Sequence, residues 1–114
     1  MKADLSTLSP HYKKVISAIQ AKAKEILPEG YEITLFGSRA RNSAREDSDW
    51  DIHILVPGPE KLSLALTGDY ASPFIILGWE IGEDIEPLVH TFSGWEKRKF
   101  LPLFKNIQNE GITL

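Results

Sequence analysis

The feature that most constrains this chain is the segment 35–56, which reads LFGSRARNSAREDSDWDIHILV. An apolar, strand-like stretch ends at Gly37-Ser38, and a second one opens with Asp49 and Asp51, one residue apart. Side chains two residues apart on a strand point to the same side, with origins roughly 6.5 Å from each other. We therefore expect both aspartates to face one site. The opposite side, which should enter a core, carries Trp50, Ile52, Ile54 and Val56.

The two neighbouring carboxylates predict a metal site. Side by side, Asp49 and Asp51 would repel and raise each other's pKa unless a cation lay between them. Oxygen ligands of this kind favour Mg²⁺ or Mn²⁺, which often take further ligands from substrate phosphates. Two such ions, about 3.5–4 Å apart, can hold the attacking and leaving oxygens of an in-line displacement. The pair therefore indicates phosphoryl or nucleotidyl transfer.

The turn before these aspartates has the composition of a phosphate site. Residues 31–36 alternate and are rich in β-branched and aromatic types, which predicts a strand. Gly37 allows a sharp turn close to a ligand, and Ser38 is expected to cap a short helix from Arg39 and to contact a phosphate. Arg39 and Arg41 suit bidentate phosphate contacts. Each part alone fits an ordinary surface turn, but their joint order favours a nucleotide site.

This order resembles the signature of the minimal nucleotidyltransferases, small members of the DNA polymerase β-like superfamily. Their pattern is an apolar strand, Gly-Ser, an Arg-rich helical turn, and Ser-Asp-x-Asp on the next strand. The resemblance implies an α/β (α+β) fold with a small mixed sheet and flanking helices, and Asp49 and Asp51 as catalytic metal ligands. The residues that it assigns to the nucleotide are Gly37, Ser38, Arg39, Arg41 and Ser48.

Relatives also use a third carboxylate on a neighbouring strand, which ligates metal and accepts the proton of the attacking hydroxyl. The candidate here is Glu86 in the segment 83–90, and Asp84, on the same side, is its rival. The alternative is that Glu86 only faces solvent, in which case the protein would bind nucleotide and turn it over poorly. Pro87 cannot donate to a neighbouring strand, which predicts an edge position for this segment.

Two positions depart from the family pattern. Asn42 stands where many relatives have glycine, and His53 stands where an aliphatic residue is usual. His53 shares the side of Asp49 and Asp51, so it either lines the edge of the site or is a partly exposed strand histidine without a ligand role. The second interpretation is favoured.

Composition bounds the remaining possibilities. The 114 residues fit a single domain, 1–114, and the formal charge of −3 with a pI near 5.6 disfavours nucleic acid as a partner. The absence of cysteine excludes disulfides and thiolate chemistry. No apolar run approaches the roughly 20 residues of a membrane span, and the start lacks the apolar region of a signal peptide. We therefore expect a cytoplasmic location without membrane contact.

The rest of the chain predicts the scaffold. Helical spacing and turn signals favour helices over residues 10–27, 60–67, 72–81 with Gly82 as the stop, and 93–107 with Ser93 as the cap and a kink at Pro102. Residues 74–77 also read as a buried strand, which leaves that segment open.

The resemblance extends to function. It implies Mg²⁺- or Mn²⁺-dependent transfer of a nucleoside monophosphate, in the first place AMP from ATP, to a hydroxyl. Relatives are often encoded with an all-helical HEPN-type toxin, act as its antitoxin, and modify its tyrosine with AMP. The alternative is a catalytically weak, nucleotide-binding antitoxin that acts by contact. A small acceptor such as an aminoglycoside is disfavoured because no second domain would enclose it. Aromatics in 93–107 are expected to serve the core, and the alternative is a surface for a partner or for a second copy of the chain.

Overall fold

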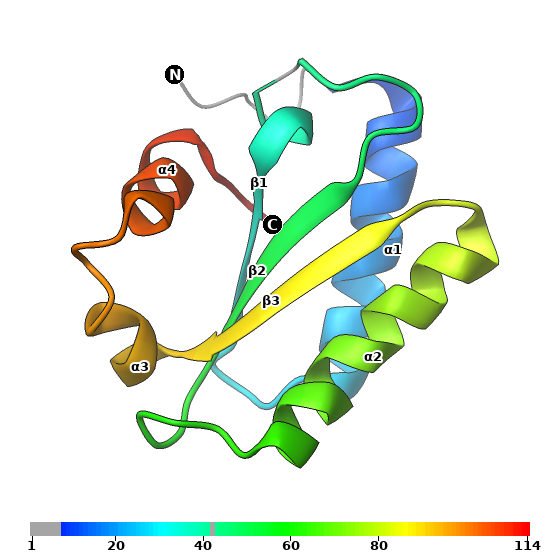
Figure 1. Ribbon diagram of the computed structural model, residues 1–114. Coiled ribbons are helices and arrows are strands. Elements are labelled where there is room, and N and C mark those ends of the chain that lie inside the picture. The colour runs from blue at the N-terminus through cyan, green and yellow to red at the C-terminus, as the bar shows by residue number, and fades with distance from the viewer. Residues whose placement is uncertain (1–7, 42) are drawn as a thin grey trace.

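Figure 1 shows the protein as a computed structural model, which describes residues 8–41 and 43–114. The expectations for Asn42 and for the first seven residues lie outside this described part. The elements follow in this order: α1 (Pro10–Ile26), β1 (Glu32–Phe36), a 3₁₀ turn η2 (Gly37–Arg39), β2 (Trp50–Val56), α2 (Leu64–Ile81), β3 (Ile85–Thr91), α3 (Phe92–Glu96), α4 (Pro102–Glu110) and β4 (Ile112–Thr113).

The strands of the described residues form one mixed sheet with the order β3-β2-β1-β4. Strand β1 is antiparallel to β2 and β4, whereas β2 and β3 are parallel. In this register Asp51 lies beside Phe36 on one side and beside Glu86 on the other. The sheet therefore places the turn after β1 and the start of β3 on opposite sides of Asp51. The edge position that Pro87 predicts for β3 is confirmed.

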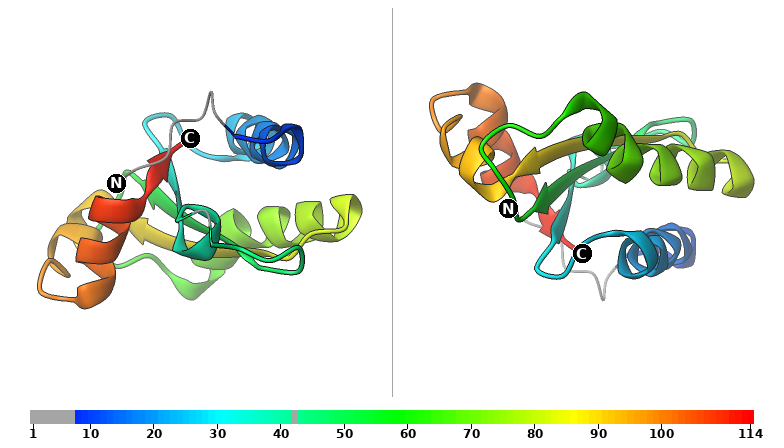
Figure 2. Two further views of the ribbon diagram at one scale, coloured as in Figure 1. Left: turned by 90° about the horizontal axis from the view of Figure 1, so that it is seen from above. Right: turned by 90° about the horizontal axis from the view of Figure 1, so that it is seen from below.

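One face of the sheet carries the main core. The alternation predicted for β2 is confirmed, because Trp50, Ile52, Ile54 and Val56 are all fully buried. They pack with apolar side chains of α1 and α2 in one cluster, which includes Ile19 and Phe74. Helices α1 and α2 lie to one side of the sheet, and α3 and α4 lie to the other (Figure 2). The predicted α/β class, a small mixed sheet with flanking helices, is confirmed.

Helix α1 begins and ends as its sequence indicates. Ser9 is the N-cap, and its hydroxyl accepts from the Tyr12 amide at 3.3 Å, while Pro10 occupies the first turn. Its apolar positions at helical spacing, Val15, Ile16, Ile19 and Ala23, all enter the core.

Helix α2 corrects two expectations. The predicted helix over 60–67 and the open segment 72–81 form one helix, which begins after the Ser63 cap and runs through Pro73 to Ile81. Pro73 removes the bond to the carbonyl of Asp69, an exposed residue, so water can solvate that carbonyl. Packing of the following Phe74 into the core then favours a helix over the strand alternative. Gly82 ends the helix with a left-handed φ of 76°, as predicted.

The C-terminal region also differs from the expected single helix. Thr91, not Ser93, caps α3, because its hydroxyl accepts from the Gly94 amide at 3.0 Å. Pro102 does not kink a helix but starts a second one, α4, where its missing N–H costs nothing. Strand β4, which the sequence did not indicate, follows Gly111 and pairs with β1. Among the described residues, none of the helices has the length and apolar character that a membrane crossing needs.

Candidate functional site

The turn between β1 and β2 brings the backbone against an acidic side chain. Gly37 adopts a left-handed φ of 74°, which an L side chain rarely accepts. A Cβ atom at this position would overlap Oδ2 of Asp51. The predicted sharp turn is therefore present, but Ser38 does not cap it: η2 starts at Gly37 itself, and its N-cap residue, Phe36, makes no side-chain capping bond.

Three exposed carboxylates meet next to this turn. One oxygen from each of Asp49, Asp84 and Glu86 lies within 4.8 Å of the other two. Parallel pairing of β2 and β3 explains the approach, since the first residues of both strands lie at the same end of the sheet. The sequence left Glu86 and Asp84 as rivals, but the structure brings both to Asp49. Asp51 adjoins this trio and leans towards Gly37 instead.

The electrostatics of the site reflect this crowding. A hydrogen bond with Asp84, followed by burial and the Asp84 charge, raises the pKa of Asp49. The Asp84 charge likewise raises the pKa of Glu86. Burial raises the pKa of Asp51, the Asp49 charge adds to this, and the Arg41 guanidinium opposes it. The protein therefore holds negative charges together that disfavour one another.

These carboxylates fit a divalent metal ion. Hard oxygen donors suit Mg²⁺ and Mn²⁺, and three oxygens this close can meet around one ion with little side-chain movement. A cation would also relieve the mutual repulsion that raises the pKa values of Asp49 and Glu86. Asp49, Asp84 and Glu86 can thus hold a metal ion together, and the role of Asp51 as a further ligand stays a prediction.

Arg39 takes a different place from the predicted phosphate contact. Its side chain is buried, and its guanidinium lies 4.4 Å from the Trp50 ring centroid. It donates to the backbone carbonyls of Glu46 and Ser48, at 3.1 and 3.0 Å. Arg39 thereby holds the loop that leads to Asp49.

Ser48 and Arg41, which were also predicted to contact the nucleotide, lie nearer the surface than Arg39. The Ser48 hydroxyl accepts from the Arg45 amide at 2.7 Å, which closes the loop before Asp49. Arg41 is exposed and pairs with Glu110 of α4 at 3.1 Å, yet it remains close enough to Asp51 to lower that residue's pKa. Of the predicted basic residues, Arg41 is thus the one whose charge reaches the acidic site.

A hydrogen-bond chain that sequence reasoning missed fixes Asp84. The Trp50 amide donates to the Asp84 carbonyl at 2.8 Å, and the Trp50 indole donates to the Glu83 carboxylate at 3.0 Å. His11 of α1 reaches the same carboxylate at 2.9 Å. These contacts join α1, β2 and the start of β3. No local sequence motif predicts these contacts, because the residues that form them lie far apart in the sequence.

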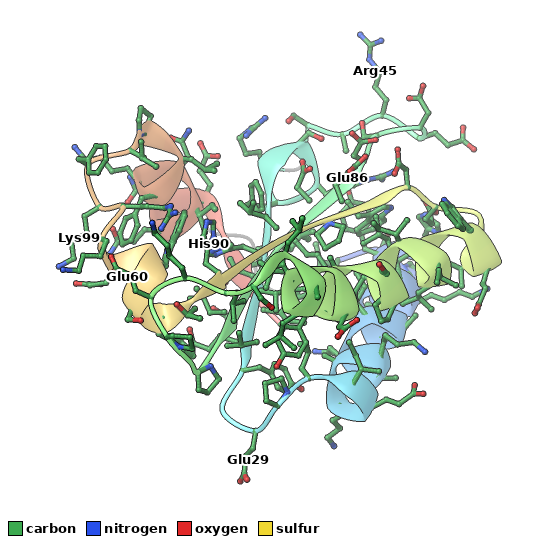
Figure 3. All side chains as sticks on the ribbon, turned by 60° about the horizontal axis from the view of Figure 1, so that its bottom comes forward. Glu29, Arg45, Glu60, Glu86, His90 and Lys99 are labelled. Carbon is green, nitrogen blue, oxygen red and sulfur yellow. The ribbon has the colours of Figure 1, made fainter. Side chains whose placement is uncertain are left out.

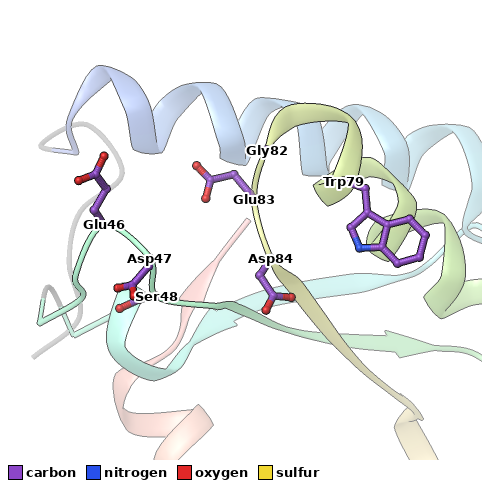
Figure 4. A pocket seen from close by; sticks show the side chains of 7 residues that line it. All are labelled: Glu46, Asp47, Ser48, Trp79, Gly82, Glu83 and Asp84. Atoms are coloured by element: carbon purple, nitrogen blue, oxygen red, sulfur yellow. The ribbon is translucent and has the colours of Figure 1, made fainter.

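A pocket of about 560 Å³ opens beside the carboxylate trio (Figure 4). It lies between the loop before β2 and the corner between α2 and β3. Asp84 belongs to both the trio and the pocket. The side chains that define the pocket's character are Glu46, Asp47, Glu83, Asp84 and the exposed Trp79.

His53 corrects a further expectation. It is buried, with 1% of its surface exposed, and neither lines the carboxylate site nor lies partly open on the strand. Its Nε2 lies 3.0 Å from Nδ1 of His90, and its ring packs against Trp95 at 4.2 Å between centroids. The carboxylate site lies near the start of β3, at Glu86, whereas the contact between His53 and His90 lies near the end of β3, beside α3 (Figure 3). Burial lowers the pKa of His53 to about 3.

Comparison with known proteins agrees with the site. A family model described as a nucleotidyltransferase domain matches residues 13–110, which include the turn at Gly37, the carboxylates of Asp49, Asp51, Asp84 and Glu86, and strands β1 to β3. A comparison with curated proteins gave no match. The resemblance to the minimal nucleotidyltransferases is thus confirmed at the level of the family. With most of its length covered by this match, the chain belongs to the nucleotidyltransferase domain family.

Proposed function

We propose that the protein transfers AMP from ATP to a hydroxyl of a partner protein, with Mg²⁺ or Mn²⁺ held at the carboxylates. One observation carries this proposal: the Asp49, Asp84 and Glu86 oxygens converge near Asp51, whose carboxylate lies against the left-handed turn at Gly37. Family membership supports nucleotidyl transfer in general. The choice of ATP and of a protein acceptor follows from the resemblance to minimal nucleotidyltransferases.

The residues have separate tasks in this reaction. Gly37 and Ser38 would seat the triphosphate through the backbone N–H groups of the turn, while the missing side chain at position 37 leaves room for the Asp51 carboxylate beside it. Arg41 would add positive charge on the same side. When bound to Asp49, Asp84 and Glu86, a divalent ion would neutralise charge that builds up on the phosphates.

The chemistry is one displacement at the α-phosphorus. The acceptor oxygen forms a bond to that phosphorus, the bond to the oxygen bridging to the β-phosphate breaks, and pyrophosphate leaves with its electron pair. Glu86 or Asp84 accepts the proton of the attacking hydroxyl. Both are exposed at the start of β3, where an acceptor can reach them.

We further propose that the protein is the antitoxin of a toxin–antitoxin pair and that its acceptor is an all-helical HEPN-type toxin. Two exposed aromatic side chains support a protein partner: Trp79 is 74% exposed and Phe100 is 79% exposed. Large apolar side chains at a surface are commonly covered in a complex, by another protein or by a second copy of the chain.

Incubation with α-labelled ATP and Mg²⁺, with and without the protein encoded beside it, tests the proposal. We expect label on the partner from the wild type and none from Asp49→Asn. Asp69→Asn, an exposed change on α2 away from the site, is the matched control and should transfer at the wild-type rate. If calorimetry shows that the protein binds nucleotide, and the partner is neutralised without becoming labelled, the protein is instead an antitoxin that acts by binding.

A further inference from the structure

We infer that the pocket between the loop before β2 and the α2–β3 corner binds the acceptor, and that the acceptor presents a positively charged protein segment beside its reacting hydroxyl. This inference rests on the proposed nucleotidyl transfer and adds the acceptor's place and character. It concerns four pocket residues that the transfer chemistry itself does not define, namely Glu46, Asp47, Trp79 and Glu83, and Asp84 links them to the carboxylate trio.

The position of the pocket follows from the direction of the reaction. In an in-line displacement the attacking oxygen and the leaving pyrophosphate lie on opposite sides of the phosphorus. The triphosphate turn adjoins Asp51 from the β1 side, whereas Asp84 and Glu86 lie on the β3 side. An attacking hydroxyl must therefore arrive from the β3 side. The pocket opens there, and it shares Asp84 with the trio.

The negative charge of the pocket favours a positively charged occupant. Glu46, Asp47, Glu83 and Asp84 line it, and no lysine or arginine does among the described residues. Such walls repel a triphosphate or a polynucleotide, and they raise the local concentration of cations. The Glu83 carboxylate is already engaged by Trp50 and His11, so the acids available to an incoming charge are Glu46 and Asp47 at the rim. An ammonium or guanidinium group matches this rim.

Trp79 indicates a protein rather than a small amine. Its indole stands on the last turn of α2, lines the pocket on the α2 side and is 74% exposed (Figure 4). A small cation bound there would leave most of this ring in water. A protein surface would cover it, and a lysine or arginine laid over the indole gains a cation–π contact as well.

Random copolymers provide defined acceptors for the test. With α-labelled ATP and Mg²⁺, we expect label on a lysine–tyrosine copolymer and none on a glutamate–tyrosine copolymer of equal length. Kanamycin, which combines hydroxyl and ammonium groups in a small molecule, serves as the third acceptor. Equal labelling of the two copolymers, labelling of kanamycin in preference to both, or labelling of none by a protein that binds ATP would overturn the inference.

Variants locate the contact. Trp79→Ala and the double change Glu46→Gln, Asp47→Asn should each raise KM for the lysine copolymer roughly five- to tenfold, with ATP affinity unchanged. Fluorescence anisotropy of the labelled copolymer without nucleotide should show the same loss. Asp69→Asn is the matched control, because Asp69 is exposed and does not line the pocket. Unchanged KM and anisotropy in the pocket variants would refute the placement.

Different results would contradict the proposed nucleotidyl transfer and the proposed acceptor pocket. If calorimetry with Mg²⁺ detects no binding of ATP, the proposed transfer fails and the acceptor site falls with it. If ATP binds and Asp49→Asn abolishes labelling of the partner, while the pocket variants label it with unchanged KM, the transfer stands and the acceptor pocket alone is wrong.

Discussion

Asp51 occupies, with its Oδ2 atom, the space that a Cβ atom on Gly37 would need. This contact joins the turn that is predicted to bind phosphate to strand β2, which carries Asp51. It depends on residue 37 in two ways, because the backbone there also has a left-handed φ of 74°. A side chain would therefore meet both a strained backbone and a filled space.

Gly37→Ala should be strongly damaging. We expect the free energy of unfolding to fall by roughly 1–3 kcal/mol, from backbone strain and displacement of Asp51, and nucleotide binding to be lost. Urea denaturation and calorimetry with ATP measure the two effects. Gly68→Ala is the control: Gly68 lies inside α2 with open space around it, so alanine should stabilise by about 0.5–1 kcal/mol. A fully stable Gly37→Ala protein would contradict the argument.

Arg39→Lys separates a structural role from a phosphate contact. Lysine cannot both stack on Trp50 and donate to the Glu46 and Ser48 carbonyls as the guanidinium does, so we expect a loss of about 1–3 kcal/mol in unfolding free energy without any nucleotide present. Arg41→Lys, at an exposed pair, should change stability by less than about 1 kcal/mol. If Arg39→Lys unfolded like the wild type but bound ATP weakly, the phosphate contact predicted from sequence would be right.

These residues show what the sequence could predict. The two sides of β2 follow from a period of two, so the core face was predictable residue by residue, and so was the turn at Gly37. The burial of Arg39 was not predictable, because spacing gives the side of an element but not whether a long side chain folds back under its own loop. The joint approach of Asp84 and Glu86 to Asp49 depends on the parallel register of β2 and β3, which no local pattern reveals.

Longer-range packing accounts for the other differences. The sequence predicted one helix ending at residue 67 and another starting at residue 72, yet burial of Phe74 and Leu77 holds α2 together across Gly68 and Pro73. His53 was expected on the acidic side of β2, but α3 covers that part of the strand, and Trp95 buries the imidazole. In each case the deciding contact comes from a residue distant in the chain.

Adding Mg²⁺ should stabilise the folded protein, whereas raising the pH in the absence of metal should destabilise it. The folded-state pKa values of Asp49, Asp51 and Glu86 are raised above 3.8, 3.8 and 4.5, so these groups favour the folded state below those values. As pH rises through the raised values, that stabilisation is lost. In chelator, Asp49→Asn should therefore melt no lower than the wild type at pH 7, while Mg²⁺ should raise the melting temperature of the wild type alone. A lower melting temperature for Asp49→Asn in chelator would contradict this.

Buried His53, which lies against the half-buried His90, predicts a separate loss of stability in acid. Because burial and the nearby His90 lower the pKa of His53 to about 3, against 6.5 for the free side chain, the unfolded chain binds more protons between these values. The free energy of unfolding contributed by His53 should thus fall as pH drops below 6.5, by up to about 1.4 kcal/mol per pH unit. The carboxylates cancel in the difference between wild type and His53→Gln, so urea titrations of both at pH 7 and pH 5 isolate this slope. Imidazole NMR resonances of His53 that titrate near 6.5 in the folded protein would show that the ring is accessible to protons, and the predicted slope would then be absent.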